Sequence, residues 1–280
     1  MAKFIPRKIE DNVNVSHTSP KAEFFYLLSA LVGIWIAVYI LLGIALNVII
    51  DRWPDRVESV LCSLIKMDRF KTNDKFVPAE KKTQQLLDSL VILLPSDMQR
   101  SYRYRVHVVE ETSANALALP CGNIIVFSGL LSKVGSENEL AMVLAHELGH
   151  FAHRDHLRAM GRGVVFAFIA SMLFGTNSAV TDFASGAISA VDLHFSRSQE
   201  MAADRFALGL LNARYGNVAG ALDFFRREDF KKQSSLISSL FSDHPSNLER
   251  ITTLKQLAIL RHYKIGALIP LDEVYNIFKQ

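Results

Sequence analysis

The feature that most limits how this chain can fold is one long apolar run near its N-terminus. Residues 24–50 include no charged side chain and are rich in leucine, isoleucine and valine. A helix needs about 20 apolar residues to cross the hydrocarbon core of a bilayer. A longer helix that is apolar on all sides is hard to enclose in a chain of 280 residues. We therefore predict one transmembrane helix at 24–50, preceded by an N-terminal tail at 1–23 and followed by one folded domain at 51–280.

The flanks of this run favour an uncleaved anchor over a signal peptide. Aromatic side chains, which prefer the membrane interface, stand at both ends of the run: Phe24, Phe25, Tyr26 and Trp53. The run is too long for the apolar part of a signal peptide, and acidic residues precede it. Basic residues are nearly balanced, with Lys3, Arg7, Lys8 and Lys21 before the run and Arg52, Arg56, Lys66 and Arg69 after it. By a small margin we expect a single-pass protein of the cell inner membrane, with its N-terminus in the cytoplasm and its folded domain outside.

A five-residue motif carries the clearest chemistry, and it reads His146-Glu147-Leu148-Gly149-His150. Residues four apart lie on one face of a helix, so the two imidazoles can bind one cation. Glu147 lies beside them, close enough to act as a base toward a water on that cation. The same pattern arises by chance on a solvated helix face, so a further ligand has to decide between the two interpretations.

A catalytic zinc ion usually takes three protein ligands, and two candidates follow the motif. His156 has the spacing of the zinc pattern H-E-x-x-H-x-x-G-x-x-H, but His153 replaces the glycine at which the chain would bend. We predict an uninterrupted helix over 151–160, which would point His156 away from the metal. Glu200 is the other candidate, because it forms a second pair at helical spacing with Asp204. We predict that Glu200 is the third ligand and that Asp204 orients one of the histidines.

Four motifs in a fixed order resemble one family of metallopeptidases. They are residues 115–130, with a turn between two apolar segments, the histidine motif, residues 200–204, and Asp243-His244-Pro245 followed by Arg250-Ile251. Together they cover roughly 102–251 and resemble the gluzincin family that contains HtpX, BepA and the zinc-dependent CAAX prenyl protease. Cys121 departs from the family's pattern, which often has glycine there, and Ala118 stands where other residues occur.

This resemblance implies a zincin-like metallopeptidase domain with one Zn²⁺ per chain, bound by His146, His150 and Glu200. It implies Glu147 as the general base. It also implies that His244 lies near the substrate carbonyl, where it could stabilise an oxyanion; on the residues alone, a histidine that caps a turn before proline is the alternative. An extended substrate is expected to pair with the edge of the strand at 122–127. The residues implied in that contact are Asn115, Gly122, Asn123 and Ile124.

The remaining pattern predicts an α+β domain that is mostly helical and has a small sheet. Residues 102–109 alternate basic with apolar side chains, which indicates a strand with one wet face. Residues 78–94 and 246–263 have the apolar spacing of amphipathic helices. Ser136 and Glu139 are typical of the cap that begins a helix, here the helix of the histidine motif.

Three further observations bear on location and partners. The apolar segment at 163–181 is too short to span a membrane, and we predict a loop or hairpin that dips toward the bilayer or covers the cleft; a re-entrant segment is the alternative. The chain has only two cysteines, and Cys121 is interpreted as a small buried residue. The net charge of +3 is too small to indicate nucleic acid as a partner, although it weakly favours an anionic bilayer surface.

These observations predict a membrane-anchored zinc endopeptidase that hydrolyses extended or unfolded protein segments, in protein quality control. Its expected partners are protein or peptide substrates and the lipid bilayer, and no oligomeric state follows from the sequence. The alternative is a membrane-tethered, zinc-containing binding or chaperone-like protein with little proteolysis.

Overall fold

The computed structural model describes residues 19–65, 67–100, 102–174, 195–226 and 247–279. Its internal contacts divide the chain into two units, Met1–Ala45 and Leu46–Gln280. The first unit contains most of helix α1 (Pro20–Arg52), the only helix in the described ranges that is long and apolar enough to cross a membrane. Its most apolar window has a mean hydropathy of 2.5 and no buried residue. The predicted N-terminal helix is therefore confirmed by length and composition.

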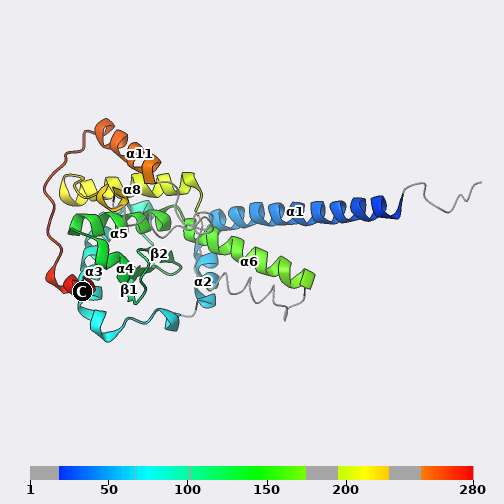
Figure 1. Ribbon diagram of the computed structural model, residues 1–280, viewed down its shortest axis with the longest axis horizontal. Helices are drawn as coiled ribbons and strands as arrows, with labels where there is room; N and C mark the ends of the chain where they lie inside the picture. Colours follow the sequence, from blue (N-terminus) through cyan, green and yellow to red (C-terminus); the bar gives the residue numbers. More distant parts are fainter. Residues whose placement is uncertain (1–18, 66, 101, 175–194, 227–246, 280) are drawn as a thin grey trace, which may run out of the picture. The chain divides into compact units, whose positions relative to one another are not determined.

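The second unit is mostly helical around one small sheet, which confirms the predicted fold class (Figure 1). The sheet contains β1 (Arg105–Val109), β2 (Ala116–Leu119) and β3 (Asn123–Phe127), in the order β1-β3-β2. β1 runs parallel to β3 and β2 runs antiparallel to it. β3 is thus the central strand, and β2 forms one edge of the sheet.

The main core lies on one face of this sheet and includes side chains of four long helices. These are α3 (Val77–Val91), α5 (Glu137–Ala152), α8 (Arg197–Tyr215) and α11 (Asn247–Leu260). Helices α5 and α8 run side by side (Figure 1). A Cβ on Gly149 would lie 2.8 Å from the Cα of Ala203, so the glycine of the histidine motif allows the two backbones to approach closely.

A second core covers the other face of the sheet. It joins the end of α1 to α2 (Pro54–Leu64) and to α6 (Asp155–Phe174), through Ile50, Leu61 and Leu157 among others. Leu117 of β2 and Ile125 of β3 pack into this second core. The neighbouring Ile124 of β3 packs into the main core on the opposite face of the sheet. The last residues of α1, from Leu46, therefore belong to the folded domain.

Two predictions about the segment after the histidine motif are wrong. Residues 151–160 do not form an uninterrupted helix, because α5 ends at Ala152 and Arg154 adopts a left-handed backbone with φ of 59°. Asp155 then begins α6, which continues to Phe174. The predicted loop or hairpin at 163–181 is therefore helical as far as Phe174, since no proline interrupts this apolar stretch; residues 175–181 lie outside the described ranges.

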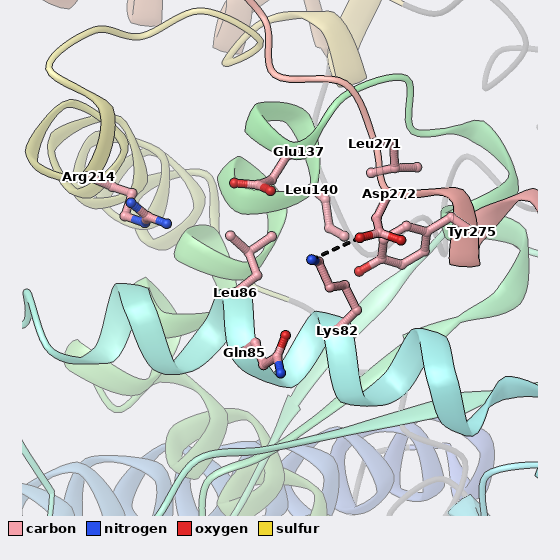
Figure 2. Close-up of a pocket in the computed structure, with 9 residues that line it drawn as sticks. All are labelled: Lys82, Gln85, Leu86, Glu137, Leu140, Arg214, Leu271, Asp272 and Tyr275. Atoms are coloured by element: carbon pink, nitrogen blue, oxygen red, sulfur yellow. Dashed lines mark ion pairs between the residues drawn. The ribbon is translucent and has the colours of Figure 1, made fainter.

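Residues 270–275 near the C-terminus, called the strap below, contact the N-terminal end of α5 and the side of α3. Ser136, the N-cap of α5, forms a β-bridge with Pro270, and the Tyr275 hydroxyl lies 2.9 Å from the Thr83 hydroxyl of α3. Lys82 and Asp272 form an ion pair at 2.8 Å beside a small pocket of about 150 Å³ (Figure 2). The hydrogen bond to Asp272 raises the pKa of Lys82. The strap thus holds the N-terminal end of α5 against α3.

A disulfide corrects the interpretation of Cys121 as simply a small buried residue. Cys62 of α2 and Cys121, in the turn between β2 and β3, are bonded, with their Cα atoms 6.0 Å apart. Cys121 has φ of 62°, a left-handed conformation that favours glycine. The residue that departs from the family's pattern is therefore the one that links α2 to the sheet.

The packing of the second core predicts where α1 can be truncated. A chain that begins at Leu46 keeps Ile50, which is fully buried, whereas a chain that begins at Asp55 loses it. Loss of such a side chain costs about 2–5 kcal/mol, so we expect the Asp55 variant to unfold at least roughly 5 °C lower than the Leu46 variant. Thermal unfolding of the two purified proteins measures the difference. Equal Tm values would show that the end of α1 does not stabilise the domain.

Candidate metal centre

The three predicted ligands come from two helices and converge at one point. The Nε2 atoms of His146 and His150 lie 3.1 Å apart, and each lies 3.5 Å from one carboxylate oxygen of Glu200. One ligand atom from each residue lies within 4.8 Å of the others, and all three side chains are buried. Two imidazole nitrogens and a carboxylate oxygen form the donor set of many catalytic zinc sites, so this cluster fits the predicted metal.

Hydrogen bonds at the helix N-termini fix the two elements that carry these residues. The Ser136 hydroxyl accepts from the amide of Glu139 at the start of α5, as the sequence predicts. Ser196 and Gln199 form a reciprocal capping box at the start of α8, and Glu200 follows it directly. The third ligand is therefore placed in the first turn of a capped helix, where the backbone is well defined.

Each histidine has its own carboxylate on the side away from the ligand cluster. Asp204 lies 3.0 Å from the Nδ1 of His146, and Asp155 lies 3.1 Å from the Nδ1 of His150. A carboxylate in this place fixes the tautomer and leaves Nε2 toward the metal. Asp155 was not identified from the sequence, because its position depends on the turn at Arg154 that ends α5.

Arg250 of α11 completes the cluster on the Asp204 side. Its guanidinium donates two hydrogen bonds to Asp204, at 2.7 and 2.6 Å, and its Nη1 lies 3.3 Å from Glu200. The face of Phe225 lies 4.4 Å from the guanidinium carbon. The sequence indicates Arg250 only as part of a motif, and the structure places it among the buried groups of the site.

Burial and neighbouring charges shift the pKa values of the two histidines in opposite directions. Burial lowers the pKa of His146 to about 4. Burial also acts to lower that of His150, but hydrogen bonds with Asp155 and Glu200 and the charge of Glu147 outweigh it and raise the pKa to about 9. Burial acts to raise the pKa of Asp204, yet its hydrogen bonds with Arg250 and His146 hold it down at about 2. Asp204 is thus an anion at neutral pH.

Glu147 and Phe195 border the ligand cluster. Glu147 lies between the two histidines on α5 and is 3% exposed, and its charge contributes to the raised pKa values of His150 and Arg250. Phe195 stacks on the ring of His150, with centroids 3.8 Å apart and the planes 19° from parallel. The stacked ring closes one side of His150.

The strand predicted to bind substrate is the central strand of the sheet. β3 pairs with β1 on one side and β2 on the other, so the expectation that a substrate pairs with the edge of 122–127 is wrong. Ile124 is fully buried in the main core, and Asn123 bonds to Pro120 and His107. Gly122 lies in the turn before β3, and Asn115 directly precedes the edge strand β2. The strand order could not be read from the residues.

Two histidines remain to be placed. His156 does not join the ligand cluster; its Nε2 faces Glu58 of α2 at 3.2 Å. The prediction that it points away from the metal was therefore correct, although for the wrong reason, since a turn rather than a continuous helix directs it there. His244 lies outside the residues that the structure describes, so its role stays a prediction.

Comparison with known proteins places this geometry in a family. The profile of Peptidase family M48 matches residues 79–258. The chain is 31% identical to the mitochondrial metalloendopeptidase OMA1 of Arabidopsis thaliana over 56% of its own length and 32% of the relative's. It is 29% identical to the metalloprotease LoiP of Escherichia coli over 62% of its length and 69% of LoiP. It is 26% identical to a putative beta-barrel assembly-enhancing protease of Vibrio cholerae, over 68% of its length and 42% of the relative's.

The chain thus spans between about a third and two thirds of the curated relatives it matches. The matched residues include both helices of the ligand cluster and Arg250. The profile and the two-helix cluster of His146, His150 and Glu200 agree, and the chain belongs to peptidase family M48.

Proposed function

We propose that this protein is a membrane-anchored, zinc-dependent endopeptidase that holds one zinc ion per chain at His146, His150 and Glu200. The observation that carries the proposal is the convergence of these three buried side chains, with Glu147 between the two histidines. A structural zinc site is usually closed by four protein ligands, whereas a catalytic site keeps one position for water or substrate. Three ligands beside a carboxylate suit the catalytic kind.

The reaction we propose is hydrolysis of a peptide bond. A bound zinc ion supplies Lewis acidity and lowers the pKa of a water ligand to roughly 7. Glu147 accepts the proton of the attacking water and then delivers it to the departing amine. Asp204 and Asp155 hold the Nδ1 atoms of the histidines, and Arg250 keeps Asp204 ionised, so the ligand rings do not need to reorient during turnover.

We propose that an extended substrate lies along β2, the edge strand that follows Asn115. One side of β2 is paired with β3, and the opposite side is an edge of the sheet. β2 also packs close to α5, which carries the histidines. Strand addition reads the substrate backbone more than its side chains. Unfolded or loosely folded segments present such a backbone, which supports a role in protein quality control. The Vibrio relative's name, a putative assembly-enhancing protease, is consistent with this role.

We further propose that the catalytic domain faces an oxidising compartment, outside the cytoplasm of the cell, while α1 spans the inner membrane. The charge balance around α1 favours this orientation only slightly, and the Cys62–Cys121 disulfide gives independent support. Structural disulfides persist in oxidising compartments and are rare in the cytosol.

The family resemblance also implies that His244 lies near the substrate carbonyl, and we propose this role on that resemblance alone.

Zinc content tests the ligand set. Alanine at His146, His150 or Glu200 removes one of three metal bonds, so each variant should lose most of its zinc during dialysis, while the wild-type protein keeps about one ion per chain. His156→Ala should still bind one ion at saturating zinc, because His156 lies outside the ligand cluster. Metal analysis of the purified proteins measures this. Loss of zinc in His156→Ala with full retention in Glu200→Ala would reverse the assignment.

Glu147→Gln separates metal binding from chemistry. The amide has the shape of the carboxylate but cannot accept the proton, so zinc content and Tm should stay near the wild-type values while casein hydrolysis falls by at least roughly 10²-fold. Rates with and without a chelator complete the assay. A wild-type protein that holds unfolded casein in both conditions and cuts it in neither would favour a binding or chaperone-like function instead.

Thiol accessibility tests the orientation of the domain. Cells are treated with a thiol-blocking reagent, lysed, and their proteins are reduced and labelled with a maleimide that adds mass. Both cysteines should be labelled only after reduction, because the disulfide protects them from the first reagent. A Cys62→Ser variant is the control, since Cys121 should then be blocked directly. Free thiols in the wild-type protein would contradict the proposed compartment.

A further inference from the structure

The C-terminal end of the metal helix α5 is held by the side chains of Arg100 and His156. The last carbonyls of a helix lack partners within it and favour positive charge. Arg100 donates to the carbonyls of Phe151 and Ala152, at 3.3 and 3.1 Å. His156 faces the carbonyl of His150, with its Nδ1 at 3.3 Å. The carbonyl held by His156 thus belongs to a predicted metal ligand.

His156 is in turn held by Glu58 of α2. Its Nε2 lies 3.2 and 3.3 Å from the two carboxylate oxygens, and both side chains are buried. The ring of His156 is thus held between the carbonyl of His150 on α5 and the carboxylate of Glu58 on α2. A buried polar group that loses its hydrogen-bond partner is disfavoured, which ties the position of His156 to Glu58.

The carboxylate of Glu58 is itself fixed by the sheet. One of its oxygens accepts from the amide of Cys121 at 2.5 Å, and the disulfide from Cys121 to Cys62 holds the following turn of α2 in the same place. Glu58 therefore connects the β2–β3 turn to His156, the residue that directly follows Asp155. Since Asp155 bonds to the ring of His150 and His156 bonds to its carbonyl, two adjacent residues hold this ligand from two sides.

We propose that Glu58 is a positioning residue for the metal site. Through His156 it fixes the end of α5 and the start of α6, and so it sets the orientation of the His150 ring toward the metal. This inference rests on the proposed zinc site but concerns a residue of α2 that contacts none of the three ligand side chains. Its effect should therefore appear in the affinity for zinc, by about the 10- to 100-fold typical of groups that orient metal ligands.

The test compares three variants of the full chain in detergent, with zinc as the only added ligand. Glu58→Ala removes the contact, and its dissociation constant for zinc, measured by competition with a chelator dye, should rise at least about 10-fold. Glu58→Gln should stay within about 3-fold of wild type, because the amide keeps the length of the side chain, can accept from the amide of Cys121 and can hydrogen-bond to His156. Leu61→Ala is the matched control, since it removes a buried side chain of the second core from the same helix.

Leu61→Ala should lower Tm but leave the zinc affinity within about 3-fold of wild type. If Glu58→Ala does not fold, Glu58→Asp takes its place, because it keeps the charge and shortens the reach to His156. It should then bind zinc more weakly than Glu58→Gln. The proposal is overturned if loss of zinc affinity follows loss of Tm equally in Leu61→Ala and the Glu58 variants, or if Glu58→Ala binds zinc as tightly as wild type.

The same variants distinguish this inference from the proposed function. Failure of the proposed zinc site would appear in the wild-type protein as the absence of stoichiometric zinc. Failure of the positioning role would leave wild-type zinc binding intact and remove only the difference between Glu58→Ala and Leu61→Ala. Where turnover is measurable, kcat should fall in Glu58→Ala while KM changes little, since Glu58 lies on α2 and not on the edge strand proposed to bind substrate.

Discussion

The close packing of α5 against α8 is the contact on which the rest of the site depends. The histidines and Glu200 lie 50 residues or more apart in the chain, and only this contact brings them to within ligand distance. Gly149 makes it possible, because any side chain there would meet the backbone of Ala203. Once the helices are this close, Glu200 and Asp204, one turn apart on α8, face His146 from two sides. The ligand and the group that orients it thus arise from one helix face.

The ligand set could be predicted because helical spacing alone places His146, His150, Glu200 and Asp204 on two faces. Helical spacing does not predict positions beyond a turn in the chain. Asp155 follows a left-handed residue, Arg154, and no regular period predicts where the chain goes after such a turn. The role of Arg250 depends on how α11 packs against α8, and the pairing of Cys62 with Cys121 joins residues 59 positions apart.

The order of the strands in the sheet could not be predicted from the sequence either. The residues of β3 predict a strand, but they do not indicate which strands flank it. β3 is buried on both faces, with Ile124 in the main core and Ile125 in the second, as expected for a central strand. An edge strand such as β2 looks similar here because both cores cover it as well. Hydrophobic pattern therefore predicted the sheet and could not predict its free edge.

The conformation of Cys121 links two positions of the sequence in an unexpected way. A left-handed backbone costs a residue other than glycine about 1–2 kcal/mol, and at Cys121 the disulfide is what offsets this cost. A chain that lost Cys62 alone would keep the strained residue without its bond. We therefore expect the two positions to change together during divergence, with glycine returning at 121 whenever the cysteine at 62 is absent. Among relatives, the residue in this turn would then reveal whether α2 is covalently attached to the sheet.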